Sequence, residues 1–298
     1  MGIYHEFVSG IDEGENADEV RVSNWNAKHA ETEYYPMLFR LTLESGVPIS
    51  FTDQSAKTTL YLTPYNGNTI ALYDGSSSWT VFSSAQMSLS LSGYTTARPY
   101  DIWVYNNSGT PTMASTIWTN ATTRGTALAY QDGVLVKSGA TNYRYIGTIY
   151  TSATGQCSDT EVFRGVWNMY NRVYRYLLIV NDTNGHEYES SRRLWNNTTT
   201  NNLLTFVIGQ PENVTYGFAD GYIWGADYEY KYIEAKTSYA SSPSVWGAMS
   251  NEDTVVYSGF SSCTHPVGMY TISMYEYNAD GYLGAEFDRF RMMGYLEM

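Results

Sequence analysis

Short apolar runs that alternate with polar residues, each followed by a turn, organise the chain from residue 59 to residue 174. In the segment 100–106, YDIWVYN, Ile102 and Val104 share one side of an extended strand and Trp103 lies on the other. A two-residue period is typical of a pleated strand that presents one face to a core. The pattern therefore predicts a series of short β-strands.

Turn signals separate these runs. Asp or Asn followed by Gly supplies a positive φ at low steric cost, which favours a tight hairpin. The turns predicted in this way are Asn66-Gly67, Asp74-Gly75, Asn107-Ser108-Gly109, Asp132-Gly133 and Ser138-Gly139. The strands on either side of each turn are expected to pair as antiparallel neighbours.

One local pattern concerns Tyr100. Leu91 and Gly93 precede a turn, and Tyr100 opens a strong strand. This order resembles the tyrosine corner of fibronectin type III and immunoglobulin-like domains, in which the phenol hydroxyl bonds back to the upstream backbone. We expect a structural role for Tyr100 rather than a role in a site.

A second β region follows, with little helix expected because no segment has a sustained 3.6-residue apolar period. Residues 181–185 (NDTNG) and 278–281 (NADG) are predicted hairpin turns, the first between the first two strands of the region and the second between the last two. The predicted strands are VYRYLLIVN, HEYESSRRLW, LLTFVIG, YEYKYIEAK, EDTVVYSGF, GMYTISMYEYN and GAEFDRFRMMG. So many medium-length antiparallel strands indicate a jelly-roll-like sandwich.

The expected organisation is thus all-β: two antiparallel β-sandwich (jelly-roll-like) domains preceded by an extended N-terminal arm. The arm covers residues 1–35, the first sandwich 36–165 and the second 166–298. Residues 10–20, GIDEGENADEV, carry five acids and no base, without a strand or helix period. Such a segment cannot bury enough apolar surface to order itself.

The stretch from residue 59 to 174 also resembles a domain found in many phage and prophage virion structural proteins. The resemblance rests on many ordered matches: Leu60-Tyr61, Thr63-Pro64-Tyr65, Gly67, Ile70-Ala71-Leu72-Tyr73-Asp74-Gly75, Trp79, Leu91-Ser92-Gly93, Pro99-Tyr100-Asp101, Trp118-Thr119-Asn120, Gln131-Asp132-Gly133, Val136-Lys137-Ser138-Gly139-Ala140-Thr141, Arg144-Tyr145-Ile146-Gly147-Thr148 and Trp167-Asn168-Met169-Tyr170-Asn171-Arg172-Val173. It implies a place in the virion and non-enzymatic work, and it brings no catalytic residues.

The arm carries a related resemblance. Arg21, Trp25, Asn26 and His29 belong to a segment that resembles a short N-terminal piece common in phage tail and fibre proteins. An isolated Trp in a polar arm is a natural anchor for a partner's pocket. We therefore expect these four residues to dock the arm on another virion protein; the alternative is a mobile tail.

Composition agrees with an all-β protein that has polar, hydroxyl-rich surfaces, since only 16% of the residues are charged while 29 are Tyr and 8 are Trp. A net charge of −13 argues against a nucleic-acid partner, because phosphate binding needs clustered Lys and Arg. No run approaches the about 18 apolar residues of a membrane span, and the start lacks the apolar region of a secretory signal.

No cofactor or metal is expected. Cys157 and Cys263 are far apart and match no metal or redox spacing, so they are expected to be free or buried thiols. The four histidines are scattered and are expected on the surface or at an interface rather than as metal ligands. They are His5, His29, His186 and His265.

Tyr and Trp cluster in the second β region and form a candidate oligomer or glycan surface. A core position or a seam between subunits is the favoured interpretation, and stacking on sugar rings is the alternative. Its members are Tyr222, Trp224, Tyr228, Tyr230, Tyr232, Trp246, Tyr275 and Tyr277. A homotrimer joined through this region is expected, with the tract 222–232 at the seam.

Acidic residues near the same strands could in principle serve a glycosidase, which needs two carboxyl groups facing each other across a cleft. We interpret them as solvated strand faces and expect no enzymatic activity. They are Asp182, Glu187, Glu189, Asp220, Asp227, Glu229 and Glu234.

The leading hypothesis is a phage virion structural protein of the tail-fibre or receptor-binding type. It would dock through its arm on the outer surface of the particle after synthesis in the host cytoplasm. The alternatives are a capsid decoration or head-fibre protein and, from another class, a polysaccharide-degrading tail enzyme. The expected partners are other virion proteins, further copies of the chain and a possible cell-surface glycan, with no membrane insertion.

Overall fold

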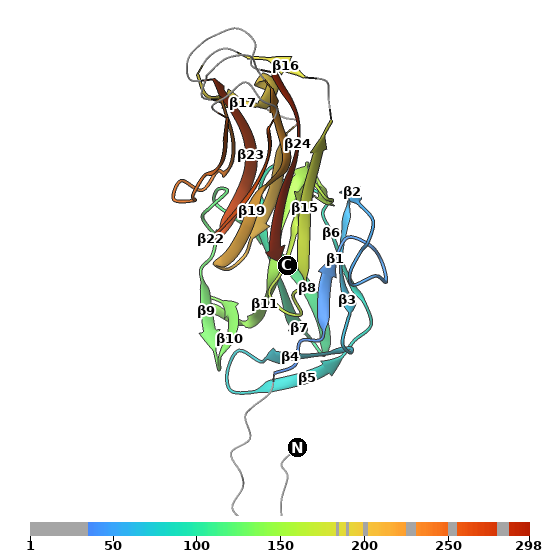
Figure 1. Ribbon diagram of the computed structural model, residues 1–298. Helices are drawn as coiled ribbons and strands as arrows, with labels where there is room; N and C mark the ends of the chain where they lie inside the picture. The colour runs from blue at the N-terminus through green and yellow to red at the C-terminus, as the bar shows by residue number, and fades with distance from the viewer. Residues whose placement is uncertain are drawn as a thin grey trace, which may run out of the picture. The chain divides into compact units, whose positions relative to one another are not determined.

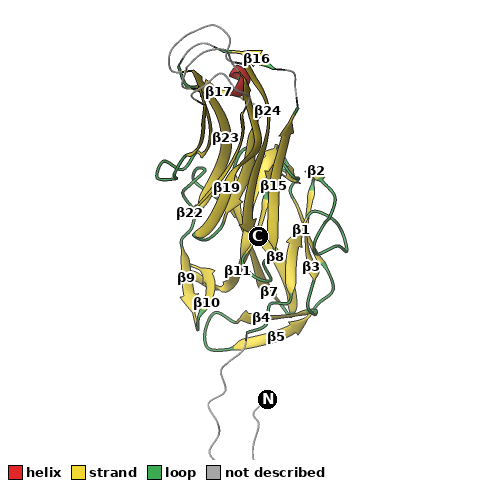
Figure 2. Cartoon of the chain, viewed as in Figure 1, coloured by secondary structure: helices red, strands yellow, loops and turns green. Residues whose placement is uncertain are grey.

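The computed structural model describes residues 35–182, 185–188, 191–198, 202–224, 231–249, 255–278 and 286–298. These residues form β-strands and one short 3-10 turn, Trp195–Asn197 (Figure 1, Figure 2). The prediction of an all-β protein is confirmed. The chain separates into two units, Met1–Tyr35 and Pro36–Met298, and the following description concerns the second unit.

The described part of the chain contains twenty-four strands. The first fourteen are β1 (Phe39–Thr42), β2 (Gln54–Lys57), β3 (Thr59–Pro64), β4 (Thr69–Tyr73), β5 (Trp79–Ser83), β6 (Met87–Ser90), β7 (Pro99–Asn107), β8 (Thr110–Ile117), β9 (Leu128–Gln131), β10 (Val134–Lys137), β11 (Ala140–Ala153), β12 (Gln156–Asp159), β13 (Phe163–Arg164) and β14 (Val166–Asn168). The other ten are β15 (Tyr174–Asn181), β16 (His186–Glu187), β17 (Arg193–Leu194), β18 (Leu203–Ile208), β19 (Glu212–Trp224), β20 (Lys231–Thr237), β21 (Val245–Met249), β22 (Val255–His265), β23 (Gly268–Asn278) and β24 (Glu286–Glu297).

A first hydrophobic core joins two small sheets to one face of the largest sheet. The small sheets are the three-stranded β1-β3-β6 and the two-stranded β4-β5. Phe39 and Leu62 from the three-stranded sheet lie in one buried cluster with Ile102 of β7 and Ile149 of β11. All four side chains are fully buried.

A second core lies between the largest sheet, which has 14 strands, and a five-stranded sheet. The main path of the 14-stranded sheet runs β21-β20-β23-β18-β13-β12-β11-β10-β9, and that of the five-stranded sheet runs β15-β24-β19-β22. Phe206 of β18 and Ile272 of β23 meet Phe218 of β19 and Met292 of β24 in this core. Figure 1 shows β15, β24, β19 and β22 side by side.

Strands β7 and β11 contribute to both cores. Ile102 lies in the first core, whereas its neighbour Trp103 lies in the second with Tyr145 and Trp167. The alternation expected for YDIWVYN is therefore confirmed, but the expectation that only one face meets a core is wrong. The other face is covered as well, because strands from the second half of the chain pack against it.

The division predicted at residue 165 falls inside one compact unit. Strand β11 pairs with β14 across that boundary, with Gly147 opposite Asn168, and β13 pairs with β18, with Phe163 opposite Thr205. The two stretches thus share sheets as well as a core. The boundary between residues 35 and 36, in contrast, coincides with the division between the two units.

Two of the predicted turns have the geometry that their sequence favours. Ser108 and Gly109 have φ values of 51° and 93°, and Asp132 and Gly133 have 51° and 80°. Each pair forms a two-residue hairpin loop, which joins β7 to β8 and β9 to β10. Positive φ at both central residues is the type I′ geometry that matches strand twist.

Tyr100 behaves as the tyrosine-corner pattern predicts. Its hydroxyl accepts a hydrogen bond of 2.8 Å from the backbone N–H of Thr95, five residues upstream. Its ring stacks on Tyr94 with 4.2 Å between the ring centroids. The phenol therefore closes the loop that leads into β7.

Two predicted hairpins are wrong. Strands β15 and β16 both pair with β24, one after the other along the same strand, so the segment 181–185 does not join a hairpin. Strands β23 and β24 belong to different sheets, so 278–281 does not join one either. Of these segments, residues 183–184 and 279–281 lie outside the described residues.

Candidate functional site

Four aromatic side chains gather on the outer face of the 14-stranded sheet, over β20, β21 and β23. We call the group formed by Tyr232, Trp246, Tyr275 and Tyr277 the aromatic patch. Strand pairing places them there, because Tyr232 lies opposite Tyr277, and Glu234 lies opposite both Trp246 and Tyr275. Opposite residues on neighbouring strands share a face.

The alternation of these strands decides which side chains point outward. In β20, Ile233 and Ala235 are fully buried in the second core, so Tyr232 and Glu234 face the other way. In β23, Met274 likewise points into the core, which leaves the tyrosines on either side of Glu276 outside. The patch is thus the reverse side of a core sheet.

Ring contacts give the patch a defined shape. Tyr232 meets Trp246 edge-on, with 6.1 Å between centroids and 82° between planes. It also lies 5.7 Å from the ring of Tyr277. Trp246 is 53% exposed, whereas the three tyrosines are half-buried. The indole therefore presents the largest accessible aromatic surface.

An ion pair borders the aromatic rings. The Nε of Arg192 lies 2.5 Å from Oε2 of Glu234, and the Arg192 guanidinium lies 3.5 Å from the ring centroid of Tyr275. The Glu234 side chain is only 3% exposed, while that of Arg192 is 41% exposed. A cation on an aromatic face next to an exposed indole suits the binding of a ring-shaped or planar ligand.

Some predicted members of this surface lie elsewhere. Tyr222 belongs to β19 in the five-stranded sheet, where the Arg289 guanidinium lies 5.4 Å from its ring centroid. Trp224 ends the same strand. Tyr228 and Tyr230 lie outside the described residues, as do the arm residues Arg21, Trp25, Asn26 and His29.

Arg192 is a member that sequence reasoning missed. It is 42 residues from Glu234 along the chain, and no local pattern links the two. Glu234 was recognised only as one acid among several. Their pairing depends on how β17 and β20 flank β23 in the sheet.

Two of the candidate carboxylates are engaged in ion pairs, and Asp182 and Glu187 are exposed. Asp220 lies 3.4 Å from Arg291, and Glu234 binds Arg192. Glu189, Asp227 and Glu229 lie outside the described residues. Within the described ranges, no group of three His, Cys, Asp or Glu side chains is placed to hold a metal ion.

The two described histidines have partners inside the protein. His265 is fully buried, so the expectation of a surface position is wrong for it, and its Nε2 lies 2.9 Å from Oγ1 of Thr237. Burial lowers the pKa of His265. His186 Nε2 lies 2.5 Å from Oε2 of the buried Glu276, which also binds Arg193.

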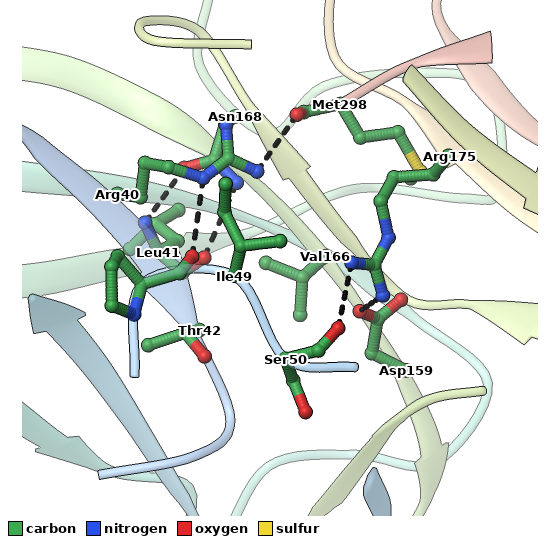
Figure 3. Close-up of a pocket in the computed structure, with 11 residues that line it drawn as sticks. Arg40, Leu41, Thr42, Ile49, Ser50, Asp159, Val166, Asn168, Arg175 and Met298 are labelled. Carbon is green, nitrogen blue, oxygen red and sulfur yellow. Dashed lines mark hydrogen bonds and ion pairs between the residues drawn. The ribbon is translucent and has the colours of Figure 1, made fainter. Parts of the chain in front are cut away.

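A second polar cluster holds the two cores together around a small cavity of about 20 Å³ (Figure 3). Arg40 donates to the carbonyl of Met298 at 2.9 Å, and burial lowers the pKa of its guanidinium to about 10. Arg175 donates to the carbonyl of Ser50 at 2.8 Å and to Asp159 at 3.3 Å. These contacts attach the end of β24 to β1 of the three-stranded sheet, so their role is structural.

Comparisons with known proteins yield only distant likenesses. No protein-family model and no curated protein matches the chain. An insecticidal delta-endotoxin from Bacillus thuringiensis aligns at 9% identity and a TM-score of 0.25 over 86% of this chain and 51% of its own. A chain of infectious bursal disease virus aligns at 9% identity and 0.24 over 82% and 70%.

An exo-β-1,3-galactanase from Phanerochaete chrysosporium aligns at 13% identity and a TM-score of 0.18 over 86% of this chain and 56% of its own. The chain therefore spans about half the length of the endotoxin. Scores this low carry no argument about function. In addition, no helix among the described residues has the length and apolar character needed to cross a membrane.

Proposed function

We propose that the protein is a non-enzymatic structural component of a phage virion, of the tail-fibre or receptor-binding type. The arm, residues 1–35, holds it on the particle, and the β unit faces outward. The resemblance of residues 59–174 to virion structural proteins supports this assignment, as does the all-β fold. One structural observation carries it furthest.

That observation is the division of the chain at Tyr35 and Pro36. A compact β unit begins directly after an acidic segment that contains Trp25. A docking segment attached to an independent β unit is the arrangement that an attached, outward-facing protein needs. Three or more such segments in one assembly would also bind a particle more tightly than one, because the later contacts are made at high effective concentration.

The aromatic patch supports the receptor-binding part of the proposal. It combines a half-exposed indole with an Arg–Glu pair on the outer face of a sheet. Sugar rings stack on such aromatic faces, while their hydroxyl groups bond to charged side chains beside them. We therefore assign the patch to contact with a cell-surface glycan.

Deleting residues 1–35 tests the docking role. The truncated chain should remain folded and soluble, as judged by its circular dichroism spectrum, and should be absent from purified particles. Trp25→Ala in the full chain should reduce incorporation, and Tyr130→Ala, at a side chain 74% exposed on β9, is the matched control. Normal incorporation of the truncated chain would contradict the proposal.

Imaging of labelled particles then distinguishes the tail from the capsid. Label on the shell would replace the tail-fibre assignment with a capsid decoration or head-fibre role. A reducing-sugar release assay on host polysaccharide tests the non-enzymatic assignment. Sugar release by the purified chain would contradict it.

A further inference from the structure

Three polar side chains lie together on the inner face of the 14-stranded sheet, where β20 begins and β23 ends. They are Lys231 of β20 and Glu276 and Asn278 of β23, and we call them the polar trio. Each exposes 1% of its surface or less, and Lys231 is the one fully buried lysine among the residues that the structure describes. Lysine, glutamate and asparagine rarely lie completely inside a protein, so their meeting at one point is unusual.

Strand register sets the members of the trio beside one another. Lys231 lies directly opposite Asn278 in the antiparallel pair of β20 and β23, and Glu276 lies opposite Ile233. Alternation places the three polar side chains on the face that also carries the buried Ile233 and Met274. Directly opposite residues have Cβ atoms about 4.5–5.5 Å apart, a gap that a lysine side chain can bridge to the carboxamide beside it.

Hydrogen bonds and ion pairs fix the orientation of the carboxamide and the carboxylate. Nδ2 of Asn278 donates to the carbonyl of Tyr188 at 3.3 Å. The carboxylate oxygens of Glu276 lie 2.5 Å from Nε of Arg193 and 2.5 Å from Nε2 of His186. Each carboxylate oxygen has two lone pairs, so Glu276 can still accept a further proton.

Large apolar side chains enclose the trio on the side of Glu276. The ring centroid of His186 lies 5.3 Å from that of Trp195 and 5.9 Å from that of Phe287. Both of these aromatic side chains are buried in the second core. An amine withdrawn from water loses the hydration of its charged form, which favours the neutral, nucleophilic amine.

We propose that Lys231 and Asn278 become joined by an intramolecular amide bond, an isopeptide bond, that ties β20 to β23. Nζ of Lys231 attacks Cγ of Asn278, and the new bond between these atoms replaces the bond from Cγ to Nδ2. The side-chain nitrogen of Asn278 leaves as ammonium. One amide replaces another, so the reaction consumes no oxidant, reductant or cofactor. Groups held side by side in a fold react far faster than the same groups free in solution.

Glu276 carries the protons in this reaction. The ammonium form of Lys231 loses two protons on becoming an amide, and the departing nitrogen of Asn278 gains two. The carboxylate of Glu276 accepts each proton from Nζ and passes it to Nδ2, as a general base and then a general acid. Diagonal neighbours on paired strands lie about 7–8 Å apart, which long side chains can span.

The bond would reinforce the sheet that carries the aromatic patch. Residues 231–278 contain β21 and β22 and end with β23, so the bond closes this whole segment into a covalent loop. Strands β20 and β23 would then stay joined even when the hydrogen bonds between them open. The reaction takes place inside one folded chain and needs no partner protein.

Intact-mass spectrometry of the full purified chain tests the bond. The wild-type chain of 33.6 kDa should be lighter than its sequence by one ammonia, about 17 Da. Lys231→Met and Asn278→Ala should each have the mass of their own sequence. Lys236→Met, at the neighbouring lysine on the other face of β20, is the matched control and should keep the deficit. A wild-type chain with its full sequence mass would overturn the proposal, as would a deficit that survives in Lys231→Met.

Digestion of the wild-type chain with trypsin locates the bond even if the variants fail to fold. Trypsin does not cleave after an acylated lysine, so residues 194–236 should be recovered in one piece, joined to residues 237–289. Separate peptides 194–231 and 237–289 would refute the bond.

Glu276→Gln tests the proton carrier, because it keeps the size of the side chain and removes its basic oxygen. The variant should have the circular dichroism spectrum of the wild type and its own full sequence mass. A deficit of about 17 Da in this variant, formed as fast as in the wild type, would show that the proton takes another route.

Discussion

At the scale of single residues, the hydrogen bonds of Tyr100 and Glu212 show how a polar atom inside this protein acquires a partner. Tyr100 bonds to a backbone group only five residues away, so a local sequence pattern was enough to predict it. Glu212 bonds to three residues from two distant segments, Trp167, Arg172 and Glu297, and no sequence pattern pointed to it. The first contact closes a loop, whereas the second ties the start of β19 to β14 and β24.

Tyr100→Phe should lower the free energy of unfolding by about 1–2 kcal/mol, because the N–H of Thr95 loses its acceptor in a half-buried position. Chemical denaturation monitored by tryptophan fluorescence measures the change. Tyr130→Phe, at an exposed tyrosine, should change it by less than about 0.5 kcal/mol. Equal effects of the two substitutions would contradict the role given to the Tyr100 hydroxyl.

Glu212 should make stability depend on pH. Burial raises the pKa of Glu212 to about 7, against the opposing effects of Trp167 and Arg172. Because the folded protein holds this proton more tightly than the unfolded chain, the contribution to stability is present below about pH 4.5 and is lost as the pH rises through about 7. Glu212→Gln removes the titration and keeps an oxygen that can accept from Trp167 Nε1.

Between about pH 5 and about pH 8 the wild-type free energy of unfolding should therefore fall relative to that of Glu212→Gln by on the order of 2 kcal/mol, and the melting temperature should fall with it. Differential scanning calorimetry at both pH values measures it. Glu187→Gln, at an exposed carboxylate on β16, controls for the loss of one negative charge. A difference that is constant with pH, or one that grows in the opposite direction, would show that Glu212 is ionised throughout.

At the scale of elements, β19 is a long strand that sequence reasoning missed, as it also missed β21. Strand β19 lies in the middle of the five-stranded sheet between β24 and β22. Its sequence, ENVTYGFADGYIW, contains Gly217, Asp220 and Gly221, which locally resemble turn residues. In the structure they serve a long strand with a register shift between Phe218 and Gly221, where Asp220 has a φ of 53°.

Gly217 is required by close packing of backbones. A Cβ there would lie 2.0 Å from the carbonyl oxygen of Gly259 on β22, and a backbone atom cannot move aside as a flexible side chain can. Gly217→Ala should therefore lower the melting temperature by roughly 5–10 °C, which corresponds to about 2–3 kcal/mol. Thr215→Ala, on the same strand and face, should lower it by less than half as much. A neutral Gly217→Ala variant would show that β19 and β22 are less closely paired.

At the scale of the whole molecule, strand pairing across residue 165 makes residues 36–298 one compact unit. Trp103, Tyr145 and Tyr150 precede residue 165 but lie in the second core. Residues 166–298 expressed alone would leave that core open on one side, since the side chains that complete it would be missing.

The fragment 166–298 should accordingly show no cooperative thermal transition and weak near-ultraviolet circular dichroism. The fragment 36–298 should have both, because it contains the complete compact unit. A cooperative transition in the shorter fragment would restore the two-domain organisation expected from the sequence.

The sequence by itself determined the features that depend on neighbouring residues. Period-two alternation predicted most of the strands, β19 and β21 excepted, and which side chains share a face, and Asp-Gly and Ser-Gly pairs predicted the hairpins at 108–109 and 132–133. These features follow from pleat geometry and from φ preferences, which act over a few residues. Part of the aromatic patch was predicted for the same reason, since Tyr232, Tyr275 and Tyr277 alternate within their strands.

Only the tertiary structure decided which strands pair and what covers each face. It placed Arg192 on Glu234, left Tyr222 on the other sheet, and joined two expected sandwiches through β7 and β11. Pairing between strands far apart in the chain depends on the burial that the whole assembly of sheets achieves, and alternation within one strand specifies only that one side will be covered, not by which partner.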